Sequence, residues 1–324
     1  MNEIKTCPEG MVCLINPKAA NSKWMRRKRL RRHLEETLQG EILGPSGDSS
    51  TTVAMTREAC LRSRIVVATG GDGTIADVLQ GIFESGRASE TVLGIIPFGS
   101  GNAFRKSFGI PKKTLKALSI LSEGVPRPVD VMQVEDKYAG FASVGATAAI
   151  TIDKIRKKIP GFWGHVLAIG RLISFPRDEK TIDLYDGVDP DGRPFAHKTV
   201  TSNFFDCIVA KTNYFGYSWK AAPKARLDDG LLDITLIETG VFKYGLAFPF
   251  IFLGWFQKTQ RNFKARKVVI RGKGLPVQYN GEILGRRDIV TFEVRPAALK
   301  VLCPDTPEGR KYFCRLPGAE ATRS

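Results

Sequence analysis

The sequence predicts an α/β domain with a parallel sheet, followed by an antiparallel β domain. Two short apolar runs, Ile65–Ala68 and Val92–Phe98, are each followed by a glycine-rich turn and a helical pattern, which is typical of parallel α/β structure. After Val129 the pattern changes to short strand-like runs separated by turn residues. With 324 residues the chain exceeds the length at which single cores usually stop growing. We therefore expect two domains, with a boundary near Pro128.

The first glycine turn, Gly70–Thr74 (GGDGT), lies between a predicted buried strand and a helix that begins near Thr74. Its glycines allow backbone N–H groups to approach a polyanion, and the helix N-terminus adds positive potential. Asp72 is informative because a carboxylate beside bound phosphate repels it unless it holds a metal or handles a proton. The alternative is a turn that only joins a strand to a helix. Neither the GxxxxGK[ST] nor the GxGxxG motif is present.

A second glycine turn, Gly99–Asn102, follows the next strand and leads into the helical segment Ala103–Phe108. In a parallel sheet both turns lie at the carboxyl ends of their strands, where such sheets bind ligands. This coincidence favours a phosphate site over a plain connection. A helix over Lys113–Glu123 completes the first half.

Upstream of these turns we expect a strand, Met11–Asn16, and a helix between Asn21 and Gln39. The helix carries leucines at i, i+4 spacing and many basic residues. The basic residues indicate either a solvated face or a contact with acidic lipid headgroups or nucleotide phosphates. Only Trp24 interrupts them with an aromatic ring, so we expect no nucleic acid partner. The basic residues are Lys23, Arg26, Arg27, Lys28, Arg29, Arg31 and Arg32.

The second half should form an antiparallel β domain, because few helices separate its strand-like runs. Two helices are expected there, Phe162–Leu172 and Val241–Gln257, and Pro249 should kink the second. The second helix holds too many large apolar residues for one ordinary face. It is either docked deep in the core or presents an apolar surface to a lipid tail or a membrane interface. The runs are VDVMQVED, FASVG, TIDLYDG, NFFDCIVAKT, LLDITLIETG, KVVIRG, PVQYNGEI and IVTFEVR.

The formal net charge is +16, from 49 basic and 33 acidic residues, which favours an anionic partner. The six cysteines show no metal-binding spacing, so we interpret them as reduced packing residues. The first fifteen residues lack the order of a signal peptide. The longest uncharged apolar run, Tyr244–Phe256, is shorter than the ~20 residues that span a bilayer. We expect a cytoplasmic protein that associates peripherally with membranes.

Two stretches of the second half carry further candidate groups. Leu227–Asp233 (LDDGLLD) places adjacent carboxylates in a turn, which either binds Mg²⁺ with backbone carbonyls and waters or is a solvated Asp-Gly turn. Asn280-Gly281 has the sequence of a type I′ hairpin turn, and Glu282 follows it.

Taken together, these segments resemble the catalytic-domain family shared by diacylglycerol kinases, sphingosine and ceramide kinases, and their bacterial lipid-kinase relatives. The resemblance covers most of the chain, in the family's order. GGDGT alone is less specific, because NAD kinases share it. The matching segments are Asn16-Pro17, Gly70–Thr74, Pro97–Asn102, Asp228–Asp233, Asn280–Glu282 and Arg295–Pro304.

The resemblance implies a nucleotide-binding α/β domain over residues 1–128 and a β-sandwich lipid-substrate domain over residues 129–304, with ATP in the cleft between them. It also implies that residues 305–324 return to the first domain. The implied reaction is transfer of the γ-phosphoryl group of ATP to a hydroxyl of a diacylglycerol-like or sphingoid lipid at an acidic membrane surface. The resemblance also implies that the metal is Mg²⁺ and that the reaction belongs to lipid metabolism and phospholipid biosynthesis. A homodimer is compatible with the sequence.

By matching position, Glu282 would be the general base on the lipid hydroxyl, and Asp72 would orient the nucleotide's Mg²⁺ or assist the proton transfer. Asp229, with the carbonyls of Arg226 and Leu231, would hold a second, structural Mg²⁺. Thr74 would cap its helix and touch ATP. The complete set expected to bind ATP is Asn16, Gly70, Gly71, Asp72, Gly73, Thr74, Asp77, Gly99, Ser100, Gly101 and Asn102.

Several positions depart from the family pattern and leave the acceptor lipid open. Ala76 stands where Asn is usual, Asp77 where Glu is usual, Ala103 replaces the Asp of GTGND, and Asn280 replaces the Asp of DGE. Two rivals follow. One is an NAD kinase-like enzyme, against which stand the GSGN turn and the aromatic helix. The other is a catalytically silent lipid-binding protein, against which stands the presence of both Asp72 and Glu282.

Overall fold

The computed structural model describes residues 10–16, 41–43, 48–99, 101–157, 178–215, 219–240 and 253–314, together with positions 32, 36, 243 and 250. The chain divides into two compact units. The first comprises Met1–Asp130, Arg226–Gly230 and Pro296–Ser324, and the second comprises Val131–Ala225 and Leu231–Arg295. Of the expected basic helix only positions 32 and 36 are described, and both are helical and exposed. The expected helix at residues 162–172 lies outside the described residues.

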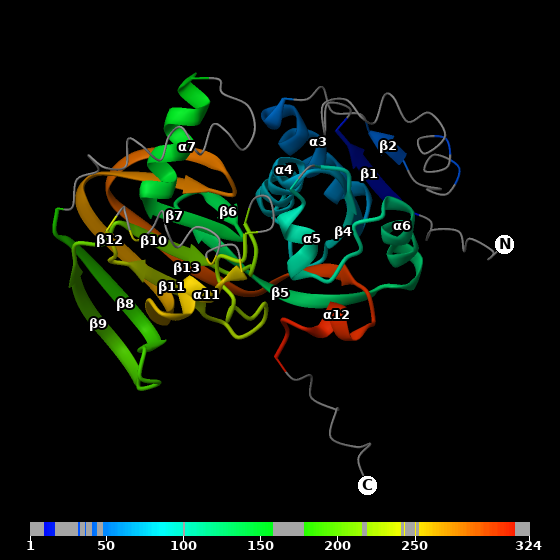
Figure 1. Ribbon diagram of the computed structural model, residues 1–324. Helices are drawn as coiled ribbons and strands as arrows, with labels where there is room; N and C mark the ends of the chain where they lie inside the picture. Colours follow the sequence, from blue (N-terminus) through cyan, green and yellow to red (C-terminus); the bar gives the residue numbers. More distant parts are fainter. Residues whose placement is uncertain are drawn as a thin grey trace, which may run out of the picture. The chain divides into compact units, whose positions relative to one another are not determined.

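The first unit contains a parallel sheet in the order β2, β1, β3, β4, joined at β4 by the end of β13 (Figure 1). Val66, Val67 and Ala68 of β3 are fully buried, as expected for a strand covered on both faces. The prediction of a parallel sheet here is confirmed. The strands are β1 (Met11–Ile15), β2 (Glu41–Leu43), β3 (Ile65–Gly70), β4 (Val92–Pro97) and β13 (Glu282–Cys303).

The helices of the first unit pack through faces that carry apolar or small residues. In α4 the residues Ile75, Val78, Leu79 and Ile82 are all buried. The sequence did not indicate α3, which packs closely on α4: a Cβ on Gly81 would lie 2.5 Å from the Thr56 Cβ atom. The helices are α3 (Ser49–Arg62), α4 (Asp72–Glu84), α5 (Ala103–Ser107), α6 (Thr114–Glu123) and α12 (Pro307–Arg310).

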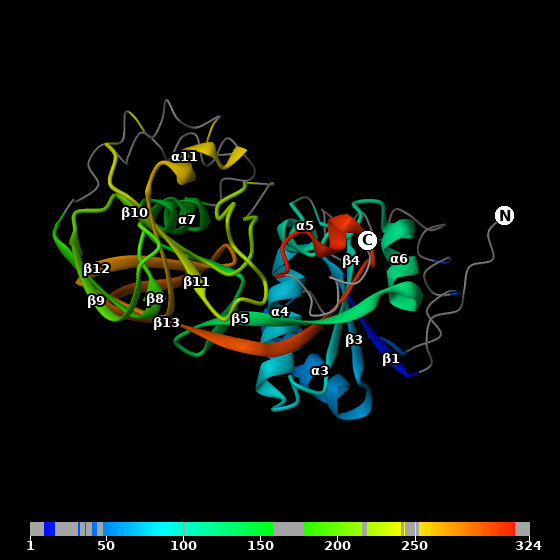
Figure 2. The same cartoon turned by 90° about the horizontal axis from the view of Figure 1, so that it is seen from below.

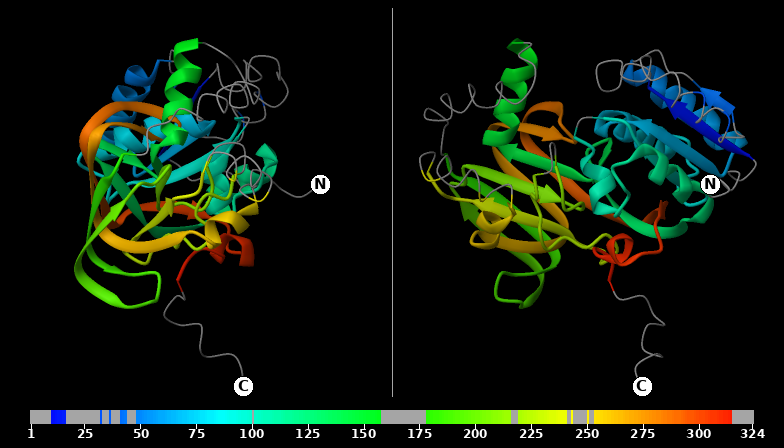
Figure 3. Two further views of the ribbon diagram at one scale, coloured as in Figure 1. Left: turned by 60° about the vertical axis from the view of Figure 1, so that its left-hand side comes forward. Right: turned by 45° about the vertical axis from the view of Figure 1, so that its right-hand side comes forward.

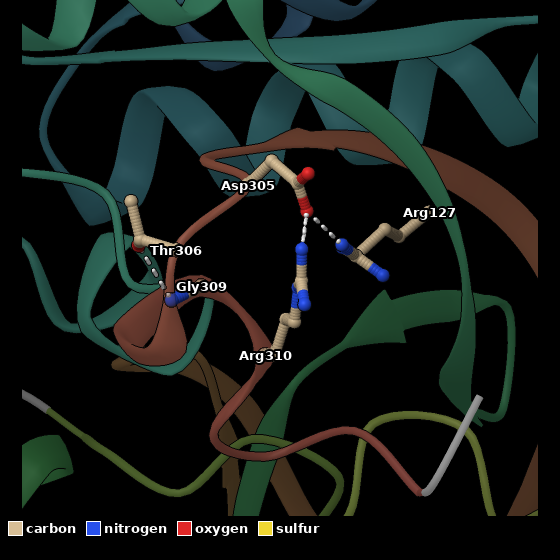
Figure 4. A network of polar contacts seen from close by, with 5 residues as sticks. All are labelled: Arg127, Asp305, Thr306, Gly309 and Arg310. Carbon is tan, nitrogen blue, oxygen red and sulfur yellow. Dashed lines mark hydrogen bonds and ion pairs between the residues drawn. The ribbon is translucent and has the colours of Figure 1, made fainter. Parts of the chain in front are cut away.

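A network of ion pairs holds the segment after β13 against the first unit (Figure 4). The Asp305 carboxylate accepts hydrogen bonds from the buried Arg127 guanidinium at 2.9 Å and from Arg310 Nε at 3.0 Å. The Thr306 hydroxyl caps α12 by accepting from Gly309 N–H. Here α12 approaches the end of α5, because a Cβ on Gly109 would lie 2.5 Å from the Glu308 carbonyl oxygen.

The second unit is built from antiparallel strands, as predicted. Strands β11, β10, β7, β12 and β13 pair in this order, and β12 also pairs with β8. Strand β8 forms a hairpin with β9, drawn in green in Figure 3. The predicted strands KVVIRG and PVQY form one long strand, β12. The strands are β6 (Lys137–Ala139), β7 (Phe141–Gly145), β8 (Lys180–Val188), β9 (Pro194–Ser202), β10 (Asp206–Ala210), β11 (Leu232–Ile237) and β12 (Arg261–Tyr279). Strand β5 (Val125–Val134) begins in the first unit and enters the second at Val131.

Two helices of the second unit differ from expectation. The sequence did not indicate α7 (Ala146–Lys157). The prediction of one helix continuing to Gln257 is wrong near its end: Gly254 has φ +75°, a left-handed conformation that interrupts the helix, and the short α11 (Trp255–Lys258) begins after it. Pro249 lies outside the described residues. Among the helices that the structure describes, none is long and apolar enough to cross a membrane.

Candidate functional site

At the N-terminus of α4 several backbone N–H groups have no hydrogen-bond partner within the helix. Gly71 is its N-cap residue and provides no side chain, and the first helical hydrogen bond runs from Ile75 N–H to the Gly71 carbonyl at 3.1 Å. The N–H groups of Asp72, Gly73 and Thr74 precede that bond and therefore have no partner within the helix. This arrangement fits a phosphate group, because both the amides and the helix dipole favour negative charge.

The two glycine turns touch backbone to backbone. A Cβ on Gly99 would lie 2.4 Å from the Gly71 Cα atom, closer than any side chain tolerates. By contrast, a Cβ on Gly73 would meet no heavy atom within 4 Å, so open space lies in front of it. Gly70 packs directly on Thr74, whose Oγ1 atom would lie 2.4 Å from an added Cβ. Among the residues that the structure describes, none fills this space, and Gly73 itself is exposed.

The second turn is closed by the side chain of Asn102. Its Oδ1 atom accepts a hydrogen bond from Gly99 N–H at 2.9 Å, and its Nδ2 atom donates to the Gly99 carbonyl at 2.7 Å. Asn102 has φ +51°, which Asn tolerates better than most residues. The Asn102 side chain therefore fixes the conformation of the turn to which it belongs. Gly101 is half-buried, and Ser100 lies outside the described residues.

Asp72 joins the two turns. Its carboxylate accepts a hydrogen bond from Phe104 N–H at 3.1 Å, in the first turn of α5. Burial raises the pKa of Asp72, and the N–H groups of Ala103, Phe104 and Asn102 offset part of that rise. The sequence suggested that this carboxylate must hold a metal or handle a proton. The structure gives it a further role, because it orients the second glycine turn by capping the helix that follows.

Three other predicted ATP-site residues lie along the same edge of the first unit. Asn16 follows β1, and its Nδ2 atom donates to Thr74 Oγ1 at 3.2 Å, so the two side chains fix each other. Asp77, one turn further along α4, accepts a hydrogen bond from the Ser49 hydroxyl at the start of α3. Asp77 thus joins two helices of the unit.

A buried carboxylate that the sequence analysis missed organises the turn at Asp228–Gly230. Asp130, 7% exposed, accepts hydrogen bonds from Gly230 N–H at 2.7 Å and Ala297 N–H at 2.9 Å. Its own N–H donates to the Leu227 carbonyl at 2.7 Å. An isolated acid between the apolar residues of VDVM was the available signal. Asp130 sets the shape of the turn that carries the predicted metal ligands.

The same turn also binds the segment after β13. The Asp228 carboxylate accepts from Cys314 N–H at 2.6 Å, and the Arg226 side chain donates to the Lys311 carbonyl at 3.0 Å. Asp229 is half-buried. Asp229 is the carboxylate of this turn that the resemblance assigns to Mg²⁺, and that assignment stays a prediction. A site of one carboxylate, backbone carbonyls and several waters suits this ion.

The third predicted metal ligand, the Leu231 carbonyl, belongs to the second unit and accepts a hydrogen bond from the buried ammonium group of Lys211 at 2.7 Å. Lys211 therefore competes for this oxygen with any metal ion. Among the described residues, no three or more His, Cys, Asp or Glu side chains cluster as they would in a metal site built mainly from side chains. Any Mg²⁺ here would depend on the one carboxylate of Asp229, backbone carbonyls and water.

Glu282 begins β13, directly after a tight turn. Asn280 and Gly281 have φ +48° and +92°, so both central residues are left-handed, as a type I′ turn requires. Gly281 N–H donates to Gln278 Oε1 at 2.9 Å, which fixes the turn. Glu282 is exposed, and its carboxylate makes no hydrogen bond or ion pair with the residues that the structure describes.

Asn280 ties this turn to the rest of the second unit. Its Oδ1 atom accepts from Gly140 N–H at 3.1 Å, and its Nδ2 atom donates to the Tyr138 carbonyl at 3.2 Å. The Gly140 carbonyl in turn accepts from the N–H groups of Lys211 and Thr212. An aspartate could accept the first bond but could not donate the second. The departure at Asn280 therefore has a structural use, which is to hold the hairpin that presents Glu282.

Comparison with known proteins identifies the family. Residues 10–134 match the model of the diacylglycerol kinase catalytic domain, and residues 146–303 match that of the YegS C-terminal NAD kinase beta sandwich-like domain. The chain is 30% identical over 227 residues to a protein named diacylglycerol kinase from Bacillus subtilis (strain 168), covering 65% of this chain and 70% of that one. This chain belongs to the diacylglycerol kinase catalytic-domain family.

Other members of this family extend the match. A probable YegS-like lipid kinase of Pseudomonas aeruginosa (strain PAO1) is 28% identical over 246 residues, covering 74% of this chain and 76% of that one. For a probable YegS-like lipid kinase of Xanthomonas oryzae pv. oryzae the match covers 53% of this chain and 55% of the relative, at 27% identity.

A crystal structure of a putative diacylglycerol kinase from Bacillus anthracis str. Sterne aligns with a TM-score of 0.69 and 18% identity, covering 94% of this chain and 98% of that one. At this identity the alignment shows the fold alone. The resemblance drawn from the ordered motifs is confirmed, and so is the fold class. The roles of the individual site residues stay predictions.

Proposed function

We propose that the protein is an ATP- and Mg²⁺-dependent lipid kinase that transfers the γ-phosphoryl group of ATP to a hydroxyl of a diacylglycerol-like or sphingoid lipid. One observation carries the proposal: two glycine turns contact each other at the uncapped N-terminus of α4, with open space in front of Gly73. In a chain of this family, that space is where we expect the phosphates of ATP.

Phosphoryl transfer depends mainly on positioning and on stabilising the charge of the transferred group. Here the N–H groups of Asp72, Gly73 and Thr74 would bind phosphate oxygens. Asp72 would keep the second turn in place through its bond to Phe104. Mg²⁺ would neutralise phosphate charge when bound, and Asp229 would hold a second ion in the loop that Asp130 shapes.

Glu282 suits the role of general base on the lipid hydroxyl. A general base must reach the proton that it accepts, and the exposed Glu282 carboxylate has no internal partner, among the residues that the structure describes, that competes for that proton. The hydrogen bonds of Asn280 limit the movement of Glu282, because they fix the chain two positions before it.

The test is turnover with labelled ATP and Mg²⁺ in separate reactions with diacylglycerol micelles, sphingosine micelles and soluble NAD. We expect a labelled lipid product and none from NAD. Replacing Glu282 with Gln should lower kcat by about 100-fold or more, within the usual range for loss of a general base, and leave ATP binding unchanged. A matched control is Glu293→Gln, in which a partly exposed glutamate of the same strand loses its charge.

Two outcomes would overturn the proposed kinase, and a third would overturn only the role of Glu282. Labelling of NAD alone would identify an NAD kinase-like enzyme. Binding of lipid with no turnover in any reaction would identify a catalytically silent lipid-binding protein. Full activity of the Glu282→Gln variant would remove Glu282 from the reaction and leave the proton transfer to another group.

A further inference from the structure

Three large apolar side chains of the second unit are exposed close together in the chain. Phe250, Leu253 and Trp255 are 50%, 55% and 58% exposed, and the rings of Phe250 and Trp255 stack with centroids 6.1 Å apart. The other exposed large apolar residues of the described chain stand apart from one another in the sequence. They are Leu61, Leu115, Val125 and Ile289. We call Phe250, Leu253 and Trp255 the aromatic cluster.

The cluster is attached to a well-packed element. In α11, which follows Gly254, Gln257 is fully buried and Phe256 packs on the core formed by residues such as Phe141 and Phe205. The Gln257 carbonyl also accepts from Asn262 Nδ2 at 2.9 Å. Within this four-residue helix, therefore, one side is anchored while Trp255 faces solvent, and Figure 2 shows α11 at the outside of the second unit.

The stretch of sequence that contains the cluster is basic. Between Glu238 and Glu282 the sequence contains no acidic residue, while it contains eight basic ones. Arg261, Lys264 and Arg271 are paired with acids of neighbouring strands. Lys243 and Lys258, the two nearest the cluster in sequence, are both exposed. Lys258 lies three positions after Trp255 on α11, a spacing that puts two side chains on the same side of a helix.

Exposed aromatic side chains in a stretch of sequence that has lysines and no acids match the interface of an anionic bilayer. Trp and Phe enter the boundary between headgroups and acyl chains, and lysines extend to the phosphates. Each basic residue near an anionic surface contributes about 1 kcal/mol of attraction. An apolar patch on a soluble partner gives no reason for a surrounding stretch that lacks acids.

We propose that the aromatic cluster, with Lys243 and Lys258, docks the protein on anionic membranes by inserting Phe250, Leu253 and Trp255 into the bilayer interface. The inference deepens the proposed function, on which it rests for its choice of a lipid surface as partner. Docking of this kind would bring the second unit to a membrane that contains the acceptor lipid.

The test measures binding of the full chain, without ATP, to phosphatidylcholine vesicles with and without phosphatidylglycerol. The cluster variant carries Phe250→Ser, Leu253→Ser and Trp255→Ser. Its matched control carries Leu61→Ser, Leu115→Ser and Ile289→Ser, at residues 65%, 55% and 55% exposed. We expect the cluster variant to bind anionic vesicles at least about tenfold more weakly than the wild type, and the control to change less than about twofold.

A charge variant, Lys243→Glu with Lys258→Glu, should weaken binding only to the vesicles that contain phosphatidylglycerol. Circular dichroism and thermal melting show whether each variant is folded. A folded cluster variant that binds like the wild type would overturn the proposal. So would a concentration-dependent dimer of the wild type that the cluster variant loses, because the occupant of the cluster would then be a second copy of this chain.

The experiment separates this proposal from the proposed kinase activity, because vesicle binding needs no turnover. Cluster-dependent binding without any lipid phosphorylation would support the docking surface and overturn the kinase. Lipid phosphorylation together with vesicle binding that does not depend on the cluster would support the kinase and overturn the docking surface. If both proposals hold, the cluster variant should lose activity on vesicles while it keeps activity on a dispersed short-chain lipid.

Discussion

The two units hold their candidate functional groups in opposite ways. In the first unit the groups are backbone amides, and two turns approach so closely that Gly99 and Gly71 leave no room for a methyl group between them. In the second unit the group is one exposed carboxylate, Glu282, on a hairpin positioned by the amide of Asn280. The first arrangement depends on the absence of side chains and the second on their presence. The two should therefore fail under different substitutions.

The largest effect is expected from Gly99→Ala. The added Cβ would lie 2.4 Å from Gly71 Cα and 2.9 Å from Asn102 Oδ1, so the two turns must separate. Overpacking of this kind costs about 1–3 kcal/mol of stability. Displacement of the phosphate-binding amides should lower ATP affinity by about 100-fold or more, equivalent to ~3 kcal/mol. Calorimetric titration with an ATP analogue and thermal melting measure the two effects.

Gly73→Ala is the matched control for that change. Its Cβ meets no protein atom within 4 Å, and the position lies in the first turn of α4, where alanine is a better helix former. The variant should be at least as stable as the wild type. Its methyl group would occupy space proposed for a phosphate, so ATP affinity should fall by about tenfold. Unchanged ATP affinity in both variants would show that phosphate binds elsewhere.

In the second unit the corresponding change is Asn280→Ala, which removes hydrogen bonds to Gly140 and Tyr138 and places alanine at φ +48°. The loss of two hydrogen bonds and the left-handed conformation should together cost about 2–3 kcal/mol. We expect kcat to fall with ATP affinity unchanged, because only the hairpin that carries Glu282 moves. Urea unfolding and steady-state kinetics test this.

Asn280→Asp is the conservative partner of that variant. It keeps the bond from Gly140 N–H but sets a carboxylate oxygen against the Tyr138 carbonyl, which should cost about 1 kcal/mol. Equal stability of the wild type and both variants would mean that the amide does not hold the hairpin.

What could be predicted from the sequence was the local part of each region. Short, contiguous stretches of sequence predict strands β3 and β4, both glycine turns and the type I′ turn. The sequence did not predict helix α3, because its buried residues are small or polar and form no apolar stripe. They are Thr52, Thr56, Ala59 and Cys60. The break at Gly254 was not predicted, because an apolar pattern does not show where one glycine takes a positive φ.

The connections within the sites lay beyond sequence reasoning for a different reason. Asp72 bonds to Phe104, 32 residues later, and Asp130 bonds to Gly230, 100 residues later. Periodicity and motif spacing report neighbours in the chain, whereas these contacts exist only after the sheet has formed. The sequence could therefore identify the site's candidate residues, but not the partners that orient them.

A buried acid of the second unit affects how Glu282 is tested. Asp206, fully buried at the start of β10, accepts a hydrogen bond from the Thr147 hydroxyl through Oδ2, and its Oδ1 atom has no partner among the described residues. Burial raises the pKa of Asp206 to about 7. The folded state thus keeps a proton that the unfolded chain loses near pH 3.8. Stability from this group is full below that pH and falls as the pH rises to about 7.

The smallest of the predicted effects concerns Asp206→Asn, which removes this titration. Between about pH 5 and pH 7 the wild type should lose on the order of 2 kcal/mol of stability relative to the variant, because a shift of one pKa unit is ~1.4 kcal/mol. Urea unfolding at several pH values measures the difference. Parallel pH dependences in the two proteins would show that Asp206 does not titrate in this range.

The Asp206→Asn variant also shows whether the titration of Asp206 causes the pH dependence of activity. If an inflection in the pH–rate profile near neutrality remains in the Asp206→Asn variant, it belongs to a group other than Asp206. If the inflection disappears, it came from the loss of stability in the second unit, since the amide introduced by this substitution does not change charge. The variant therefore separates a loss of folded protein from a change at the reacting groups, although Asp206 and Glu282 belong to the same unit.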